Sequence, residues 1–192
     1  MSTSRRPYAF RLHPLNVAPA SLARLLLLLA LVAPVGAAWG ADNRAPDLEG
    51  DCQKLRVQAG NKVAFHAFGV GVQIYRWNGT SWIFVAPEAV LFANAGDDGE
   101  IGIHFGGPTW QSNSGSKVVG AVEQMCTPDP DAIPWVLLKA VVNEGPGIFD
   151  RVSYIQRVNT VGGKAPTDPG DFPGQLARVP YTADYFFYRA SR

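Results

Sequence analysis

Residues 70–85 read Val-Gly-Val-Gln-Ile-Tyr-Arg-Trp-Asn-Gly-Thr-Ser-Trp-Ile-Phe-Val. Two runs rich in β-branched and aromatic residues flank Asn78-Gly79, and Asn-Gly is the strongest short-range signal for a β-hairpin. Both residues tolerate the positive φ that a tight type I′ turn requires. With Asn78-Gly79 as a two-residue loop, the expected pairs are Trp77–Thr80, Tyr75–Trp82, Ile74–Ile83 and Val72–Val85.

Side-chain alternation then sorts this hairpin into two faces, and both faces are apolar. One face carries Val72, Ile74, Ile83 and Val85. The other face carries Gln73, Tyr75, Trp77, Trp82 and Phe84. Because a surface hairpin is normally polar on its outer face, other parts of the chain must cover both sides.

Short runs of strand character recur along the rest of the chain, separated by turns rich in Gly, Pro, Asn and Asp. We expect Pro87-Glu88 to end the second strand of the hairpin, and residues 106–116 to form the longest polar loop. Within 101–105, Ile103 is expected to face inward and His104 outward. The fold class is therefore all-β, a single-domain antiparallel β-sandwich or barrel of about eight strands. The remaining expected strands are 54–57, 62–68, 89–92 (or a short turn of helix), 101–105, 117–123, 152–158, 185–188 and, with helix as the alternative, 135–142.

The first forty residues have the features of a secretory signal peptide. Four arginines and no acidic residue precede Asp42, and the apolar run at 25–38 ends in small residues. That run is shorter than the ~20 apolar residues of a membrane span. We expect a cleaved signal peptide at 1–40, an N-terminal segment at 41–60 and a β domain at 61–192. The mature protein is then periplasmic or extracellular, without a transmembrane anchor, and the general secretory and twin-arginine routes both stay open.

Charge and cysteine content narrow the classes further. Removing 41 residues removes four arginines and no acidic residue, which changes the net charge from +1 to −3. This charge argues against nucleic-acid binding, because the chain has no basic patch to contact a phosphate backbone. The chain has two cysteines, Cys52 and Cys126. In an exported protein an even number predicts a disulfide, and two allow one pairing; two free buried thiols are the alternative.

Two groups of residues could carry a function. His66 and His104, with Glu88, could form a metal site or a general base with its orienting carboxylate, although two histidines satisfied within the fold explain the pattern as well. The aromatic residues Tyr75, Trp77, Trp82 and Trp110, with Asn113, suit stacking against a small molecule or a carbohydrate. The alternative for these rings is packing between strands. No dinucleotide-binding Gly-x-Gly-x-x-Gly precedes a helix, and no cofactor is expected.

Several stretches resemble one protein family. They include Asn61-Lys-Val-Ala-Phe-His66, Gly71-Val-Gln-Ile-Tyr75, Gly107-Pro-Thr-Trp110 and Val158-Asn-Thr-Val-Gly-Gly163. Across 61–189 the chain resembles a family of exported bacterial and fungal proteins, domain of unknown function 3455. The resemblance implies no assigned activity. We therefore expect an exported binding or structural module, with a hydrolase or metal-assisted enzyme using His66, His104 and Glu88 as the alternative.

Overall fold

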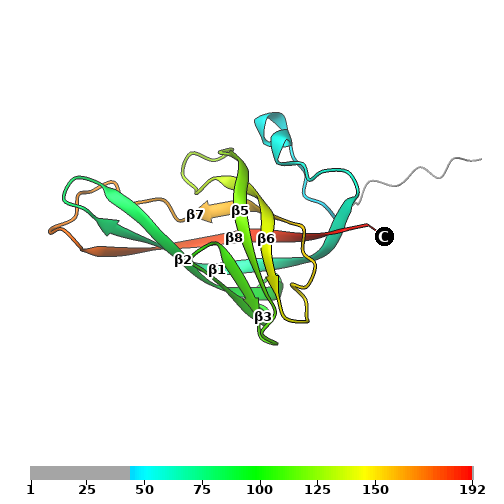
Figure 1. Cartoon of the computed structure of the whole chain (residues 1–192). Helices are drawn as coiled ribbons and strands as arrows, with labels where there is room; N and C mark the ends of the chain where they lie inside the picture. The colour runs from blue at the N-terminus through cyan, green and yellow to red at the C-terminus, as the bar shows by residue number, and fades with distance from the viewer. Residues whose placement is uncertain (1–43, 192) are drawn as a thin grey trace, which may run out of the picture. The chain divides into compact units, whose positions relative to one another are not determined.

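A computed structural model describes residues 44–191. Eight antiparallel strands follow one another around a closed barrel, and the last strand pairs with the first (Figure 1). A short 3-10 helix, η1 (Gly50–Leu55), precedes them. The strands are β1 (Asn61–Trp77), β2 (Trp82–Asn94), β3 (Asp98–Phe105), β4 (Thr109–Ser112), β5 (Lys117–Cys126), β6 (Trp135–Glu144), β7 (Tyr154–Gly162) and β8 (Leu176–Ala190).

The predicted all-β fold of about eight strands is confirmed, and of the two architectures considered it is the barrel. Each strand bonds to the next along the chain, and pairing of β1 with β8 removes the free edges that an open sheet would expose. Strands β1, β2 and β8 are the longest and run on together beyond the rest of the barrel (Figure 1). The predicted signal peptide lies outside the described residues. Within the described range, no helix has the length and apolar character needed to cross a bilayer.

The register predicted for the hairpin is wrong. Trp77 pairs with Trp82 and Tyr75 with Phe84, so residues 78–81 form a four-residue loop. The side-chain oxygen of Asn78 accepts hydrogen bonds from the N–H groups of Thr80 and Ser81, both at 2.8 Å, and this caps the longer turn. Next to the turn, the predicted partner of each β1 residue differs from the observed partner by two residues. A shift by an even number keeps every side chain on its face, so the aromatic face survives.

The sequence predicted that β2 ends at Pro87-Glu88, but the strand continues to Asn94. Val85 is an extra residue at a β-bulge, since Tyr75 pairs with Phe84 and Ile74 already with Ala86. The strand continues through Pro87, which pairs with Gln73. Pairing of β2 with β3 starts only at Ala89, so on that side Pro87 has no neighbouring strand that would need its missing N–H.

Two further local predictions are corrected. Residues 54–57 form no strand, because the chain here makes η1 and then runs irregularly to β1. In β3 the faces are reversed: His104 is buried while Ile103 is exposed. The side chains of β3 do alternate between the two faces of the strand. However, the polar ring of His104 faces the barrel interior, and the apolar side chain of Ile103 faces outward.

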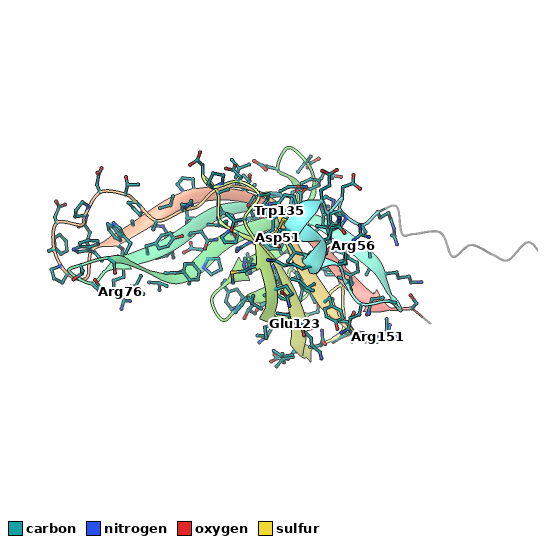
Figure 2. The ribbon with its side chains drawn as sticks, turned by 90° about the horizontal axis from the view of Figure 1, so that it is seen from above. Asp51, Arg56, Arg76, Glu123, Trp135 and Arg151 are labelled. Carbon is teal, nitrogen blue, oxygen red and sulfur yellow. A yellow bond between two sulfur atoms is a disulfide. The ribbon has the colours of Figure 1, made fainter. Side chains whose placement is uncertain are left out.

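A disulfide joins Cys52 to Cys126, as predicted, with their Cα atoms 5.3 Å apart. It ties η1 to the end of β5 within an apolar cluster on the outside of the barrel wall, to which Leu55, Val63 and Phe186 also belong. Figure 2 marks this region by Asp51 of η1, by Arg56 directly after it and by Trp135 at the start of β6, whereas Arg76 lies far away on the extended hairpin. The disulfide therefore holds η1 against the outer face of the barrel at this cluster.

Candidate functional site

The barrel encloses a pocket of about 310 Å³, here called the interior pocket. Residues from all eight strands line it, which is possible only inside a closed barrel. Barrels of eight strands leave an interior that side chains fill or that holds one small ligand. From β1 to β8 the lining includes Gln73, Phe84, His104, Trp110, Met125, Val136, Arg157 and Tyr185.

One end of the barrel is closed by the connection between β6 and β7. Residues 145–153, here called the plug loop, insert the fully buried ring of Phe149 among the rings of Phe65 and Phe187, with centroids 5.6 and 5.0 Å away. Phe149 and Phe187 belong to the interior core cluster, and the partly buried Phe65 packs against it. Phe65 lies near the start of β1, whereas the pocket-lining residues Gln73 and Tyr75 lie near its end, so the pocket lies toward the other end of the barrel.

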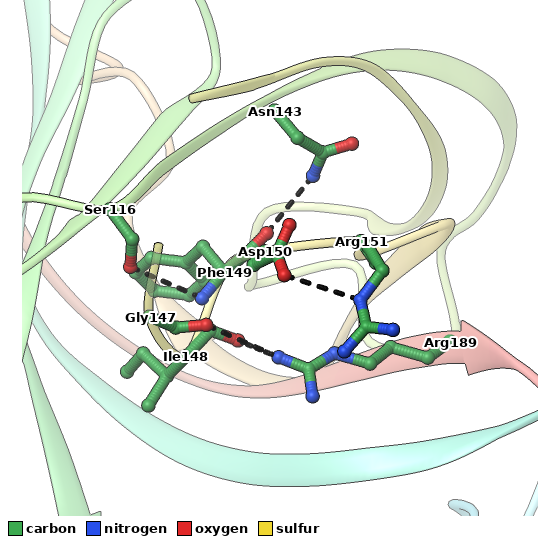
Figure 3. Close-up of polar contacts among 8 residues, drawn as sticks. All are labelled: Ser116, Asn143, Gly147, Ile148, Phe149, Asp150, Arg151 and Arg189. Carbon is green, nitrogen blue, oxygen red and sulfur yellow. Dashed lines mark hydrogen bonds and ion pairs between the residues drawn. The ribbon is translucent and has the colours of Figure 1, made fainter. Parts of the chain in front are cut away.

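Polar contacts hold the plug loop in position (Figure 3). The Asn143 amide donates to the Phe149 carbonyl at 3.0 Å, and the Phe149 N–H donates to the Ser116 hydroxyl at 3.3 Å. The Arg189 guanidinium donates to the Ile148 carbonyl at 2.7 Å. Backbone groups of the loop are thus paired by residues from the β4–β5 turn, β6 and β8, as buried backbone groups require.

The open side of the interior pocket is apolar. Phe84 and Val85 from the bulge of β2, and Val122 and Met125 from β5, line the pocket while remaining between 43% and 53% exposed. Because the bulge adds a residue, two consecutive side chains of β2 reach the pocket. These four side chains form an apolar rim, and a cluster of exposed apolar residues around a cavity is typical of a binding site.

His104 is a buried, neutral base in the wall of the pocket. Its Nδ1 lies 2.8 Å from the carbonyl oxygen of Thr109. A carbonyl can only accept, so Nδ1 carries the proton and Nε2 keeps a lone pair. Burial lowers the pKa of His104 to about 3, against a smaller upward effect of the Thr109 hydrogen bond. The ring therefore stays neutral near physiological pH.

Three polar groups of the lining are donors without acceptors. The side-chain nitrogen of Gln73, the indole nitrogen of Trp110 and Nε of Arg157 are buried and find no hydrogen-bond partner among residues 44–191. Native proteins pair nearly all such groups, and each exception needs an explanation. By contrast, the Tyr75 hydroxyl in the same lining donates to the Gly163 carbonyl at 2.7 Å. Unsatisfied donors are thus concentrated in this pocket.

Two tyrosines of β8 complete the polar environment. The hydroxyls of Tyr181 and Tyr185 lie 3.0 Å apart and hydrogen-bond to each other. Burial raises the pKa of both phenols, and the positive charge of Arg157 opposes the rise. At Tyr185 a hydrogen bond with the Arg157 side chain also opposes the rise in pKa. Both remain neutral hydroxyls, so Arg157 is the charged group of this interior.

The structure brings together three of the predicted site residues and separates the others. Trp110, His104 and Tyr75 line the interior pocket. Trp110 was expected in a polar loop, but it lies in β4 and is 1% exposed. The loop assignment is wrong for Trp110, and its ring follows the alternative of packing between strands, since His104, Tyr185 and Phe187 surround it inside the barrel.

The other aromatic candidates and Asn113 are outside the pocket lining. Trp77 and Trp82 pack on each other at the tip of the hairpin, with centroids 5.4 Å apart, and the Trp82 indole donates to the Asp168 carbonyl. Asn113 is exposed and its amide donates to the Glu100 carbonyl. These residues stabilise the long hairpin and the β4–β5 turn respectively.

The residues of the enzymatic alternative do not converge. His66 stacks on Phe186 in the outer cluster and lies 3.6 Å from Asp184, whereas His104 faces the interior. Glu88 pairs with Arg178 at the surface. Among residues 44–191 no three His, Cys, Asp or Glu side chains gather as a metal would require. The barrel wall lies between the two histidines, so His66, His104 and Glu88 do not come together in the described structure.

Gln73 and Arg157 are lining residues that were not selected from the sequence. Gln73 does alternate with Tyr75 on the aromatic face, and Arg157 alternates with the core residue Ile155, so each occupies an inward position in its strand. A polar residue at an inward position is the signal that could have identified both.

The fold and this site define a class: a closed eight-stranded antiparallel barrel with a mostly apolar interior pocket that contains one arginine. A sequence model of the family described as "Protein of unknown function (DUF3455)" matches residues 58–189. The chain belongs to this family, and the match runs from just before β1 to the end of β8. Comparisons with curated proteins and with solved structures give no match.

Proposed function

We propose that this protein binds one small, largely apolar molecule in its barrel interior and does so outside the cytoplasm. The observation that carries the proposal is the interior pocket itself, which joins an apolar rim to buried polar groups. Sites for small molecules have this composition: mainly apolar walls with a few polar groups that fix orientation. A carbohydrate would need many more hydrogen-bonding groups than this lining supplies.

The geometry also favours binding over catalysis. His104 offers an unprotonated Nε2, but no carboxylate of the described residues orients it, since its other nitrogen is bonded to the Thr109 carbonyl. A general base acts in concert with a nucleophile and a partner that orients it. The groups that line this pocket are suited to hold a molecule rather than to transform it.

Location outside the cytoplasm rests on two features. The basic and apolar leader is typical of secretion, and the Cys52–Cys126 disulfide suits an oxidising compartment. The test is the mass, under denaturing conditions, of protein recovered from the exported fraction. A chain shortened by about forty residues supports export, and a full-length cytoplasmic chain contradicts it.

Binding can be tested with N-phenyl-1-naphthylamine, a neutral fluorophore whose emission rises in an apolar site. We expect saturable binding at one site per chain. Val122→Trp puts an indole into the rim and should weaken binding at least tenfold. Val141→Trp is the matched control, because Val141 is similarly exposed on β6 but does not line the pocket. Absence of saturable binding, or equal loss in both variants, would contradict the proposal.

A further inference from the structure

We propose that the molecule held in the interior pocket is an apolar monocarboxylate, with its carboxylate group at Arg157, Gln73 and Trp110. This inference rests on the proposed function and adds the chemical class of the ligand. It follows from the charge of the lining, its unpaired donors and the apolar side chains of its rim.

The first step is the charge. Arg157 lines the pocket, and the lining contains no Asp or Glu. No ion pair of the described residues involves Arg157, whereas Arg151 and Arg178 each have a carboxylate at 3.2 and 2.8 Å. Arg157 Nη2 donates to the Pro134 carbonyl at 2.8 Å, which holds the side chain in place. Arg157 is partly buried, with its Nε fully so. Withdrawing a cation from part of its water favours a nearby counter-charge, and a bound anion would supply it.

The second step is hydrogen bonding. Arg157 Nε, the Gln73 amide nitrogen and the Trp110 indole nitrogen are donors that lack acceptors within the described chain. Gln73 and Trp110 are 2% and 1% exposed. A carboxylate is an acceptor with two oxygens, and the planar guanidinium matches it better than any other side chain does. A carboxylate would therefore supply the counter-charge for Arg157 and also an acceptor of the kind that the unpaired donors of this lining lack.

The third step separates a monoanion from a dianion. His104 is the other basic residue of the lining, and it is neutral because it is buried and donates to Thr109. The site thus offers a single positive charge. A phosphate ester near pH 7 carries nearly two negative charges, so a carboxylate fits this site better.

The last step is the body of the ligand. The pocket that Arg157 lines also includes the apolar rim residues Phe84, Val122 and Met125. A carboxylate that binds beside Arg157 would therefore leave an aromatic or aliphatic body against these side chains. Polar substituents on that body would lose their water without gaining partners.

The experiment compares 2-naphthoate with 2-naphthamide, which have nearly the same shape and differ in charge. Each displaces N-phenyl-1-naphthylamine from the wild-type protein, and the two inhibition constants are compared. We expect naphthoate to bind about tenfold tighter or more, as charge-assisted hydrogen bonds to an arginine predict. Equal displacement by both would overturn the carboxylate inference and leave the proposed function intact. Failure of the fluorophore to bind would overturn both.

Two arginine variants locate the preference. Arg157→Met removes the charge and should reduce the naphthoate preference to less than threefold. Arg178→Met removes one positive charge outside the pocket, from the pair with Glu88, and should leave the preference unchanged. A preference that survives Arg157→Met, or falls equally in both variants, would overturn the inference. If Arg157→Met does not fold, the wild-type comparison of the two probes decides.

Discussion

The imidazole of His104 lies against the indole of Trp110, with ring centroids 4.3 Å apart and planes 9° from parallel. Tyr185 meets both rings edge-on. A neutral imidazole can occupy such a site, whereas an imidazolium would lose its hydration there. The stack therefore links the protonation of one side chain to the stability of the barrel.

This link predicts an acid-sensitive stability. The pKa of His104 is about 3 in the folded state and about 6.5 in the unfolded chain. Below about pH 6.5 the unfolded state gains a proton that the folded state does not take up. The free energy of unfolding should therefore fall as the pH drops from about 6.5 toward 3, by up to ~1.4 kcal/mol per pH unit from this residue.

Urea unfolding of wild type and His104→Phe at several pH values between 3.5 and 7.5 measures this. Phenylalanine keeps a ring beside Trp110 but cannot titrate. The wild-type advantage should shrink by more than 1 kcal/mol between pH 7 and 4.5. Parallel stability curves for the two proteins would contradict the neutral buried histidine. Other groups titrate in both proteins, so the difference isolates His104.

The same residues show how far the sequence could predict this fold. Strand content, the hairpin position and the disulfide followed from local signals and cysteine number, and the structure confirms all three. The hairpin register did not follow, because Asn78 stabilises a four-residue loop as readily as it starts a two-residue one. The aromatic face was nevertheless correct, because an error of two residues preserves the face.

The interior pocket could not be predicted in the same way. Its lining comes from all eight strands, and their alignment depends on bulges such as the one at Val85. Strand β4 has four residues within a Gly- and Ser-rich stretch, so its pattern is too short to distinguish it from a loop. The inward histidine also contradicts the usual rule that the apolar residues of a strand face the core.

Phe149 closes one end of the barrel, and its truncation tests how much the plug loop contributes. Phe149→Ala should cost about 3–5 kcal/mol, since it removes a fully buried ring from between Phe65 and Phe187. Ile148→Ala is the control next to it: this side chain is 37% exposed and should cost about 1 kcal/mol or less. Chemical denaturation measures both. Similar losses in the two variants would mean that the loop does not act as a plug.

The Cys52–Cys126 bridge spans 74 positions of sequence. By restricting the unfolded chain, a cross-link over a loop of this length raises the free energy of unfolding by about 4 kcal/mol. Dithiothreitol should therefore lower the guanidinium midpoint of the wild type. It should leave the Cys52→Ala/Cys126→Ala double variant unchanged, and that variant should resemble the reduced wild type. An unchanged wild-type midpoint on full reduction, verified by thiol titration, would show that the outer cluster holds η1 without the bridge.

Gln73 and Gln156 provide a matched pair for the argument about unpaired donors. Both side chains are at most 2% exposed. The Gln156 amide donates to the Leu55 carbonyl at 2.6 Å and its oxygen accepts from the Tyr188 hydroxyl. The Gln73 amide nitrogen has no acceptor among residues 44–191. Methionine has a similar length and no amide, so Gln→Met at each position removes the polar groups with little change in volume.

Gln156→Met should destabilise the protein by about 1–3 kcal/mol, because it leaves the Leu55 carbonyl and the Tyr188 hydroxyl without this partner. Gln73→Met should change the free energy of unfolding by less than about 0.5 kcal/mol, or raise it, because a buried unpaired amide is replaced by an apolar group. Urea unfolding at neutral pH distinguishes the two. If Gln73→Met is as destabilising as Gln156→Met, the Gln73 amide stabilises the free protein. It would then not be an unpaired donor that is available to a ligand.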